Sequence, residues 1–150
     1  MSLSVRPATP DDVATLAQFN VDMALETEQL ALDPATVHRG VARLIDAPQR
    51  GFYRVAEHGG CVVGSLMVTS EWSDWRDGDM WWIQSVFVAP EARRMGVFRA
   101  LYTHVLDAAK RDADVRCVRL YVEKENRSAQ ATYARLGMLE TAYRVYEIGA

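Results

Sequence analysis

The chain changes its hydrophobic period several times along its length, and these changes predict a series of helices and strands. Apolar side chains recur at helical spacing in residues 11–24 and 34–47, whereas from residue 51 they recur at every second position. The pattern predicts six strands, at residues 3–6, 52–57, 61–70, 80–88, 117–122 and 139–148. It also predicts four helices. The first begins near residue 11, the second covers 34–47, the third follows residues 89–90 and ends near 111, and the fourth runs from 126 or 128 to 136.

The order of these elements, βααβββαβαβ, predicts an α/β fold with a mixed sheet and helices on both faces. The strand–helix–strand units near the end require parallel neighbours, whereas the two strands around the turn at residues 58–60 form an antiparallel hairpin. Residues 71–79 are polar and lead into the next strand, and Gly137 is expected to stop the last helix in a left-handed conformation. No linker or repeat divides residues 1–150, so one domain is expected.

Composition narrows the class of protein without identifying a partner. The 150 residues are 49% hydrophobic and 25% charged, which is typical of a globular domain and excludes a disordered or collagen-like chain. The net charge is −3 and no basic arm is present, so nucleic-acid binding is not expected. Of the 17 cations, 15 are Arg, which fits either phosphate recognition or codon bias, and the 20 alanines favour codon bias.

The two cysteines and the longest uncharged segment indicate the cellular compartment of the protein. Cys61 and Cys117 lie in apolar runs and are expected to be small buried side chains without a disulfide, as in a reducing compartment. Residues 59–70 form the longest segment without a charge, too short to cross a bilayer, and the N-terminus lacks the apolar core of a signal peptide. A cytoplasmic protein without a membrane partner is expected.

Residues 86–101 carry the strongest chemical signal in the chain. A strand ends, Pro90 prevents its continuation, Arg93 and Arg94 follow, and Gly96 stands where a helix begins. The free N–H groups of a first helical turn, the positive end of the helix dipole and neighbouring guanidinium groups together suit a diphosphate. An ordinary strand-to-helix turn with solvated arginines is the alternative that the segment alone leaves open.

This segment resembles the pyrophosphate loop of the GNAT superfamily, the acyl-CoA-dependent N-acyltransferases whose signature is Q/R-x-x-G-x-G/A. Arg93 and Gly96 match the signature, and Phe98 replaces its final small residue. Residues 126–138 follow the family's N-x-x-A-x-x-x-Y-x-x-x-G-F pattern except for Met138 in place of Phe, and residues 5–12 are similar to its usual first strand and helix cap.

The resemblance implies a GNAT-like fold with splayed central strands and acetyl-CoA as co-substrate, without a metal. The backbone of Val86 and Val88 would face the pantetheine arm, and N–H groups of residues 94–99 would bind the diphosphate. The cofactor-binding residues that it implies are Val86, Phe87, Val88, Arg93, Arg94, Met95, Gly96, Val97, Phe98, Arg99, Asn126 and Tyr133.

The implied reaction moves an acetyl group to the primary amine of a small molecule or peptide by direct attack. Tyr133 is the candidate proton donor, because a phenol with a pKa of about 10 suits a thiolate whose acid has a pKa of about 8.5. Its other interpretation is a core tyrosine that packs a helix on the sheet. Asn126 either contacts the cofactor or caps that helix.

The general base is not identified by the resemblance. Gln84 stands where many family members carry a Glu, and an amide cannot accept the proton. Glu26 or Glu28, near the end of the first helix, and Glu71, at the end of the third strand, are the candidates, although each also fits a solvated carboxylate. Transfer of the proton to bulk water is the remaining alternative.

All four tryptophans lie in residues 71–82. Trp72 and Trp75 form either a wall for a cationic acceptor or an anchor for a homodimer. Trp81 and Trp82 are interpreted as residues of packing or of dimerisation. The candidate substrate-binding residues are Glu28, Trp72, Trp75 and Gln84.

Two other function classes compete with the enzyme. Phe98 and Gln84 depart from the family pattern, which fits a module that binds acyl-CoA without transferring the acyl group. A nucleotide-binding protein is disfavoured because the chain has no Gly-Lys-Ser/Thr and no G-x-G-x-x-G. The three histidines are scattered and indicate neither a metal site nor a triad.

Overall fold

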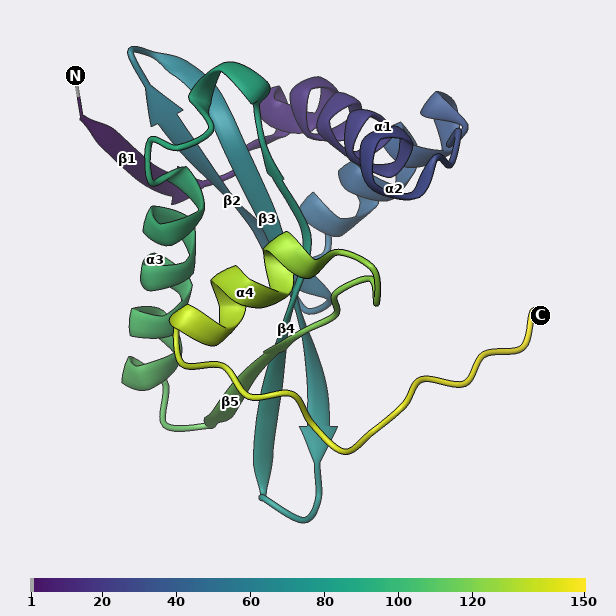
Figure 1. The fold of residues 1–150 in the computed structure, drawn as a ribbon, viewed down its shortest axis with the longest axis vertical. Coiled ribbons are helices and arrows are strands. Elements are labelled where there is room, and N and C mark those ends of the chain that lie inside the picture. Colours follow the sequence, from purple (N-terminus) through teal and green to yellow (C-terminus); the bar gives the residue numbers. More distant parts are fainter. Residues whose placement is uncertain (1) are drawn as a thin grey trace.

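The computed structural model describes residues 2–150, which form a five-stranded mixed sheet with helices on both faces (Figure 1). The strands lie in the order β1-β2-β3-β4-β5; the first four are antiparallel neighbours and β5 is parallel to β4. The elements are β1 (Leu3–Pro7), η1 (Pro10–Asp12), α1 (Val13–Glu28), α2 (Pro34–Ile45), β2 (Gly51–His58), β3 (Cys61–Ser73), β4 (Gly78–Val88), η2 (Pro90–Ala92), α3 (Val97–Arg111), β5 (Val115–Leu120) and α4 (Arg127–Arg135).

The sheet separates two apolar clusters, because successive side chains of a strand point to opposite faces. One cluster packs α1 and α2 on the sheet and includes Leu16, Val41 and Val55. The other packs α3 on the opposite face and includes Leu66 and Leu101. The mixed fold with helices on both faces is therefore as predicted.

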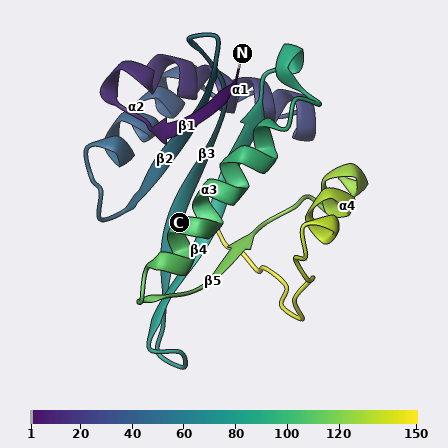
Figure 2. The ribbon, with the colours of Figure 1, turned by 90° about the vertical axis from the view of Figure 1, so that its left-hand side faces the viewer.

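The hairpin of β3 and β4 is longer than the sequence pattern indicated. The predicted strand bounds at residues 70 and 80 are wrong, because cross-strand pairing continues to Ser73 opposite Gly78 and leaves only a tight turn. Arg116 on β5 donates from Nε to the carbonyl oxygen of Arg76 (2.9 Å), and Asp77 takes the left-handed φ of 49°. The tip of the hairpin projects beyond the helices (Figures 1 and 2).

The central strands β4 and β5 diverge along their length, as the resemblance implied. They pair as far as Ile83 opposite Leu120, and the following residues of β4 have no partner on that side among residues 2–150. A register shift against β3 falls at the same place, where Ser85 has a φ of 52°. The second half of β4 therefore presents an open backbone edge.

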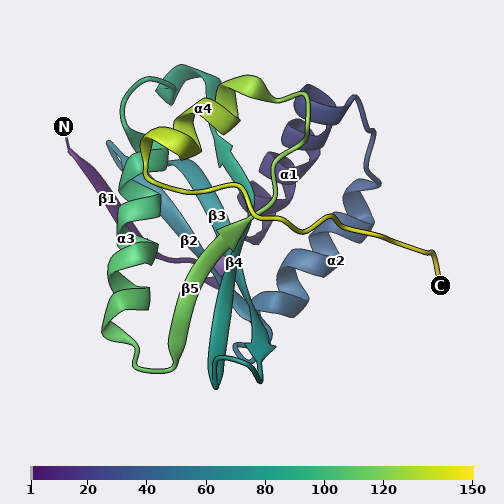
Figure 3. The same cartoon turned by 60° about the horizontal axis from the view of Figure 1, so that its bottom comes forward.

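The prediction of a last strand at residues 139–148 is wrong. Gly137 stops α4 with a φ of 91°, as expected, but residues 139–150 run on as an extended segment (Figure 3). Within residues 2–150, no backbone hydrogen bond connects this segment to the sheet. The apolar alternation is present, yet a strand forms only where a neighbouring strand supplies partners.

The two cysteines are free thiols, and only one of them is shielded. Cys61 is exposed, so its predicted burial is wrong: it is the first residue of β3 and lies at the end of the sheet, next to the Gly59-Gly60 turn. Cys117 is half-buried, and the Nη1 of Arg76 lies 3.5 Å from its sulfur. Across residues 2–150, none of the helices combines the length and the apolarity that a bilayer crossing requires.

A partly buried ion pair joins β1 to the entry of α1. The Arg6 guanidinium donates to both carboxylate oxygens of Asp12, at 2.8 and 3.0 Å, and the Thr9 N–H donates to the same carboxylate at 2.7 Å. Asp12 is 6% exposed. The hydrogen bonds from Arg6 hold the pKa of Asp12 below its usual value.

Asp12→Asn is therefore expected to lower the free energy of unfolding at neutral pH by about 1.5 kcal/mol, because it removes a charge-assisted hydrogen-bonded pair. The folded-state pKa of Asp12 lies below the unfolded one, so its contribution is complete above about pH 4 and disappears as the pH falls through the folded pKa. Urea unfolding at neutral and acidic pH measures this. The exposed Asp22→Asn on α1 is the control, and an Asp12 variant with the pH dependence of the wild type would contradict the assignment.

Candidate functional site

The junction of β4 and α3 has the properties of an anion site. Gly96 is the N-cap of α3 with a left-handed φ of 79°, and no side chain caps the helix. A Cβ placed on Gly96 would meet no atom within 4 Å, so the space in front of the loop is open. Because the first N–H groups of a helix have no partner within it, they point into this space with the positive end of the dipole.

A close approach between β3 and α3 fixes the position of this helix terminus. A Cβ on Gly64 would lie 2.6 Å from Cγ1 of Val97 and 3.1 Å from the carbonyl oxygen of Phe87. Val97, the first residue of α3, is buried against the sheet. Only glycine at position 64 therefore allows α3 to begin where it does.

The arginines of the loop have different surroundings. Arg93 forms a two-pronged ion pair with Glu26 of α1, at 2.8 and 2.9 Å, and its Nε donates to the Val88 carbonyl at 3.0 Å. Arg94 and Arg99 are exposed and form no ion pair within residues 2–150. The guanidinium groups without an ionic partner are thus those of Arg94 and Arg99, whereas Arg93 ties the loop to α1.

The open edge of β4 leads from this loop toward the centre of the sheet. Phe87 is buried, and its ring centroid lies 4.9 Å from that of Phe19 on α1. The side chain of Phe87 is thus committed to packing. Its neighbours Val86 and Val88 are half-buried and pack against the α3 cluster, so what this part of β4 offers a ligand is its backbone.

Tyr133 lies where α4 meets the first turn of α3. Its ring contacts Phe98 edge to face, with centroids 5.7 Å apart, and Phe98 in turn lies 5.9 Å from Tyr102. Burial raises the pKa of the Tyr133 phenol, which keeps it protonated at neutral pH. The Asn126 side chain caps α4 by accepting the Ala129 N–H at 3.1 Å, so the capping interpretation of Asn126 is realised.

A ladder of two polar side-chain pairs lies on the face of the sheet that packs against α1 and α2, beyond the part of that face that the two helices cover. Gln84 donates from Nε2 to the Thr69 hydroxyl at 2.6 Å, and the indole N–H of Trp82 donates to Glu71 at 2.8 Å. These pairs share a face because Gln84, Trp82 and Met80 alternate along β4. Gln84 is therefore held as a neutral hydrogen-bond donor.

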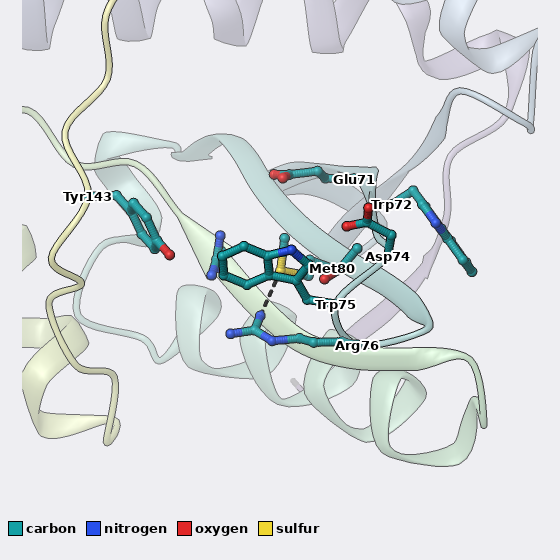
Figure 4. A pocket seen from close by; sticks show the side chains of 9 residues that line it. Glu71, Trp72, Asp74, Trp75, Arg76, Met80 and Tyr143 are labelled. Carbon is teal, nitrogen blue, oxygen red and sulfur yellow. Dashed lines mark hydrogen bonds between the residues drawn. The ribbon is translucent and has the colours of Figure 1, made fainter.

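A pocket of about 340 Å³ opens beside this ladder, under the tip of the hairpin (Figure 4). The carboxylates of Glu71 and Asp74 reach it, and Tyr143 lies across from them on the C-terminal segment. Arg119 of β5 lies between two rings, 5.7 Å from Trp82 and 5.9 Å from Tyr143. The full lining is Glu71, Trp72, Ser73, Asp74, Trp75, Arg76, Met80, Arg119 and Tyr143.

The structure brings some of the sequence candidates together and separates others. Trp72 and Trp75 line the pocket with Glu71, whereas Glu26 is paired with Arg93. Glu28 lines a different, shallow pocket with Thr27, Gln29, Glu123 and Glu125. The three candidate bases therefore do not converge on one pocket.

The packing of the remaining tryptophans agrees with the sequence interpretation. The Trp81 ring lies 5.3 Å from Phe52 in the α3 cluster, and Trp82 stacks on Tyr121 at 4.5 Å. Sequence reasoning missed Arg119 and Tyr143 as pocket residues. Their signal is weak, because each lies in a predicted strand that gave no reason to assign its side chain to the hairpin.

The chain matches the model of the Acetyltransferase (GNAT) family over residues 16–138. A possible acetyltransferase from Clostridium difficile 630 has 41% sequence identity and a TM-score of 0.93, over 100% of this chain and 99% of that one. A predicted acetyltransferase from Clostridium acetobutylicum, solved with acetyl-CoA, has 14% identity and a TM-score of 0.78 over 98% and 96% of the two chains. An aminoglycoside acetyltransferase, HMB0005, from an uncultured soil metagenomic sample has 19% identity and a TM-score of 0.73 over 100% and 99%. No curated protein matches the chain.

Proposed function

Because the chain belongs to the GNAT family of acetyltransferases, which use acetyl-CoA, we propose that it transfers the acetyl group to the primary amine of a small molecule or peptide by direct attack. The observation that carries the proposal is the uncapped terminus of α3 at Gly96 beside the open edge of β4.

The residues at the α3 terminus fit the diphosphate of acetyl-CoA. The N–H groups of residues 94–99 would hold it, and Arg94 and Arg99 would add charge because no ionic partner within residues 2–150 occupies them. The backbone of Val86 and Val88 would hold the pantetheine arm as an additional strand would. Acetyl-CoA itself supplies the thioester carbonyl that the amine attacks and the sulfur that leaves.

Tyr133 would hold the proton that the departing sulfur takes up as the C–S bond breaks and the C–N bond forms. Burial raises the pKa of this phenol, so the side chain is protonated at neutral pH, as a proton donor must be. Phe98 limits where the ring can lie. The position that the family signature gives to a small residue is thus filled by a side chain that packs on the proposed donor.

The proton that the attacking amine loses would go to Glu71, directly or through water. Both oxygens of Glu26 are occupied by Arg93, whereas Glu71 accepts only the Trp82 indole N–H within residues 2–150 and reaches the hairpin pocket. Asp74 and the indoles of Trp72 and Trp75 also line this pocket, together with the guanidinium groups of Arg76 and Arg119. We therefore place the acceptor on the hairpin side of Gln84.

Glu71→Gln is expected to lower kcat/KM for the amine about tenfold at neutral pH, because the variant cannot accept the proton. The deficit should shrink as the pH rises, since more of the amine is then already neutral. Rates over a pH series measure this. Asp74→Asn is the matched control and should raise KM with an unchanged pH profile. If Glu26→Gln rather than Glu71→Gln changes that profile, Glu26 is the base.

The function is tested by incubating the purified protein with acetyl-CoA and a panel of polyamines, amino acids, aminoglycosides and peptides with free N-termini. Release of CoA thiol above the level without amine, together with an acetyl group added to the product mass, is the expected result. If no amine in the panel promotes thiol release, the proposed reaction is wrong for these acceptor classes.

A further inference from the structure

The pocket under the tip of the β3–β4 hairpin is lined by two charges of each sign. The carboxylates belong to Glu71 and Asp74, and the guanidinium groups belong to Arg76 and Arg119. Within residues 2–150, none of these four side chains takes part in an ion pair. A charged side chain that lines a pocket without an ionic partner remains available to a group of opposite charge on a ligand. The pocket can therefore receive an anionic and a cationic group together.

Trp82 separates one carboxylate from one guanidinium in this pocket. It lies opposite Arg119 of β5 on one side and opposite Thr69 of β3 on the other, so these side chains share a face of the sheet. The indole N–H donates to Glu71 at 2.8 Å, and the ring centroid lies 5.7 Å from the guanidinium carbon of Arg119. Because β4 lies between β3 and β5, Glu71 and Arg119 face the same side of the sheet across the indole.

Arg119 is the better placed of the two arginines to receive a carboxylate. It is half-buried, and its guanidinium carbon lies 5.7 Å from the ring of Trp82 and 5.9 Å from the ring of Tyr143. Aromatic faces hold a guanidinium in place and leave its N–H groups free for a planar, two-pronged contact with a carboxylate. The exposed Arg76 instead donates from Nη1 to the sulfur of Met80 at 2.8 Å (Figure 4).

We propose that the acceptor is a free amino acid or a similar zwitterion, whose amine faces Glu71 and whose carboxylate pairs with Arg119. This inference rests on the proposed acetyl transfer and names the class of amine. The neutral form of the amine forms the C–N bond as the C–S bond breaks. Its proton goes to Glu71, the sulfur takes a proton from Tyr133, and the carboxylate is unchanged.

The charge and the size of the pocket favour this class over other amines. Two carboxylates and two guanidinium groups give a formal charge of zero, which complements a zwitterion better than a polyamine or a phosphate ester. The volume of about 340 Å³ is at the small end of the range of roughly 300–1,000 Å³ for ligand pockets, so an amino acid fits better than an aminoglycoside. Trp72 and Trp75 line the same pocket and offer indole faces to an apolar side chain.

Pairs of amines that differ only by a carboxylate test the inference: L-phenylalanine with 2-phenylethylamine, and L-leucine with 3-methylbutylamine. With acetyl-CoA, the wild type should have a kcat/KM at least about tenfold higher for each amino acid than for its partner amine, because a charge-assisted contact is lost with the carboxylate. Arg119→Gln should bring this ratio close to one, and Arg119→Lys, which keeps the charge without the planar fork, should lose part of it. Comparing each variant with the wild type on the same amine cancels differences in amine basicity.

Arg76→Gln is the matched control, because it removes the same charge from the same pocket. It should keep at least half of the preference for the amino acids, and circular dichroism checks that each variant is folded. An equal loss of preference in Arg76→Gln and Arg119→Gln, or no loss in Arg119→Gln, would overturn the assignment of the carboxylate to Arg119.

Calorimetric titration of the CoA-bound protein with the same four amines separates this inference from the proposed function. Each amino acid should bind at least about fivefold more tightly than its partner amine, and Arg119→Gln should remove the difference. Amines that are acetylated without any preference for a carboxylate would overturn the inference and leave the acetyl transfer intact. Tighter binding of the amino acids through Arg119 without release of CoA thiol would support the carboxylate site and contradict the transfer. Failure of both amino acids to bind would overturn the inference outright.

Discussion

Tyr133→Phe is expected to lower kcat by about 100-fold or more while changing the affinity for acetyl-CoA by less than about threefold. The variant keeps the ring that packs against Phe98 and loses only the hydroxyl, so the fold and the cofactor site are preserved. Without that hydroxyl, the sulfur departs as an unprotonated thiolate. The loss therefore falls on kcat, the step in which the C–S bond breaks.

Steady-state rates and calorimetric titration with CoA separate the two quantities for this variant. Tyr102→Phe is the matched control, because it removes a hydroxyl from the other tyrosine that packs on Phe98. Burial raises the pKa of Tyr133, so the wild type should lose this donor only above about pH 10, whereas the variant is impaired at every pH. Wild-type kcat in Tyr133→Phe would exclude the phenol as the proton donor.

Gly64→Val is expected to cost about 2 to 3 kcal/mol of unfolding free energy and to weaken CoA binding about tenfold or more. The added side chain collides with Val97 and with the Phe87 carbonyl, and the backbone atom cannot move without disturbing β4. The helix terminus that carries the proposed diphosphate site must therefore shift. Stability and ligand affinity should fall together.

Urea unfolding and CoA titration measure both effects. Gly40→Ala is the control, because Gly40 is exposed on α2 with no atom within 4 Å of an added Cβ. That substitution should raise the free energy of unfolding by about 0.5 to 1 kcal/mol and leave CoA binding unchanged. Unaltered CoA affinity in Gly64→Val would show that the position of α3 does not determine the cofactor site.

The fold was predictable from the sequence wherever the decisive interactions are local. Helical spacing, the turn at residues 58–60 and the glycine stop at Gly137 each act within a few residues, and the structure contains all three features. The uncapped helix terminus at Gly96 is of the same kind, because consecutive residues form it. These features needed no knowledge of distant parts of the chain.

The remaining features depend on partners that are remote in sequence. The pairing of Arg93 with Glu26 joins residues that only the packing of α1 on β4 brings together. The hairpin extends through polar residues because cross-strand pairing, aided by Arg116 at its turn, outweighs their low strand propensity. The last strand was predicted from the alternation of apolar residues. This alternation indicates which residues favour a sheet, but it does not indicate which strand edge they pair with.

The choice of general base shows the same limit. Glu26, Glu28 and Glu71 are equivalent as sequence candidates, since each lies near the end of a predicted helix or strand. Only the contacts distinguish them: Glu26 is held by a guanidinium, Glu28 belongs to another pocket and Glu71 has an available oxygen. The distinction therefore had to come from tertiary structure.

The ion pair between Arg93 and Glu26 is half exposed on both sides, so its contribution to stability is under about 1 kcal/mol. A diphosphate at the α3 terminus carries more charge than one carboxylate and can compete for the same guanidinium at little cost in free energy. Arg93 can therefore exchange the carboxylate of Glu26 for a bound anion. If Arg93 paired with a diphosphate instead, Glu26 would lose this ion pair, so anion binding at the loop and the contact between the loop and α1 would oppose each other by the same free energy.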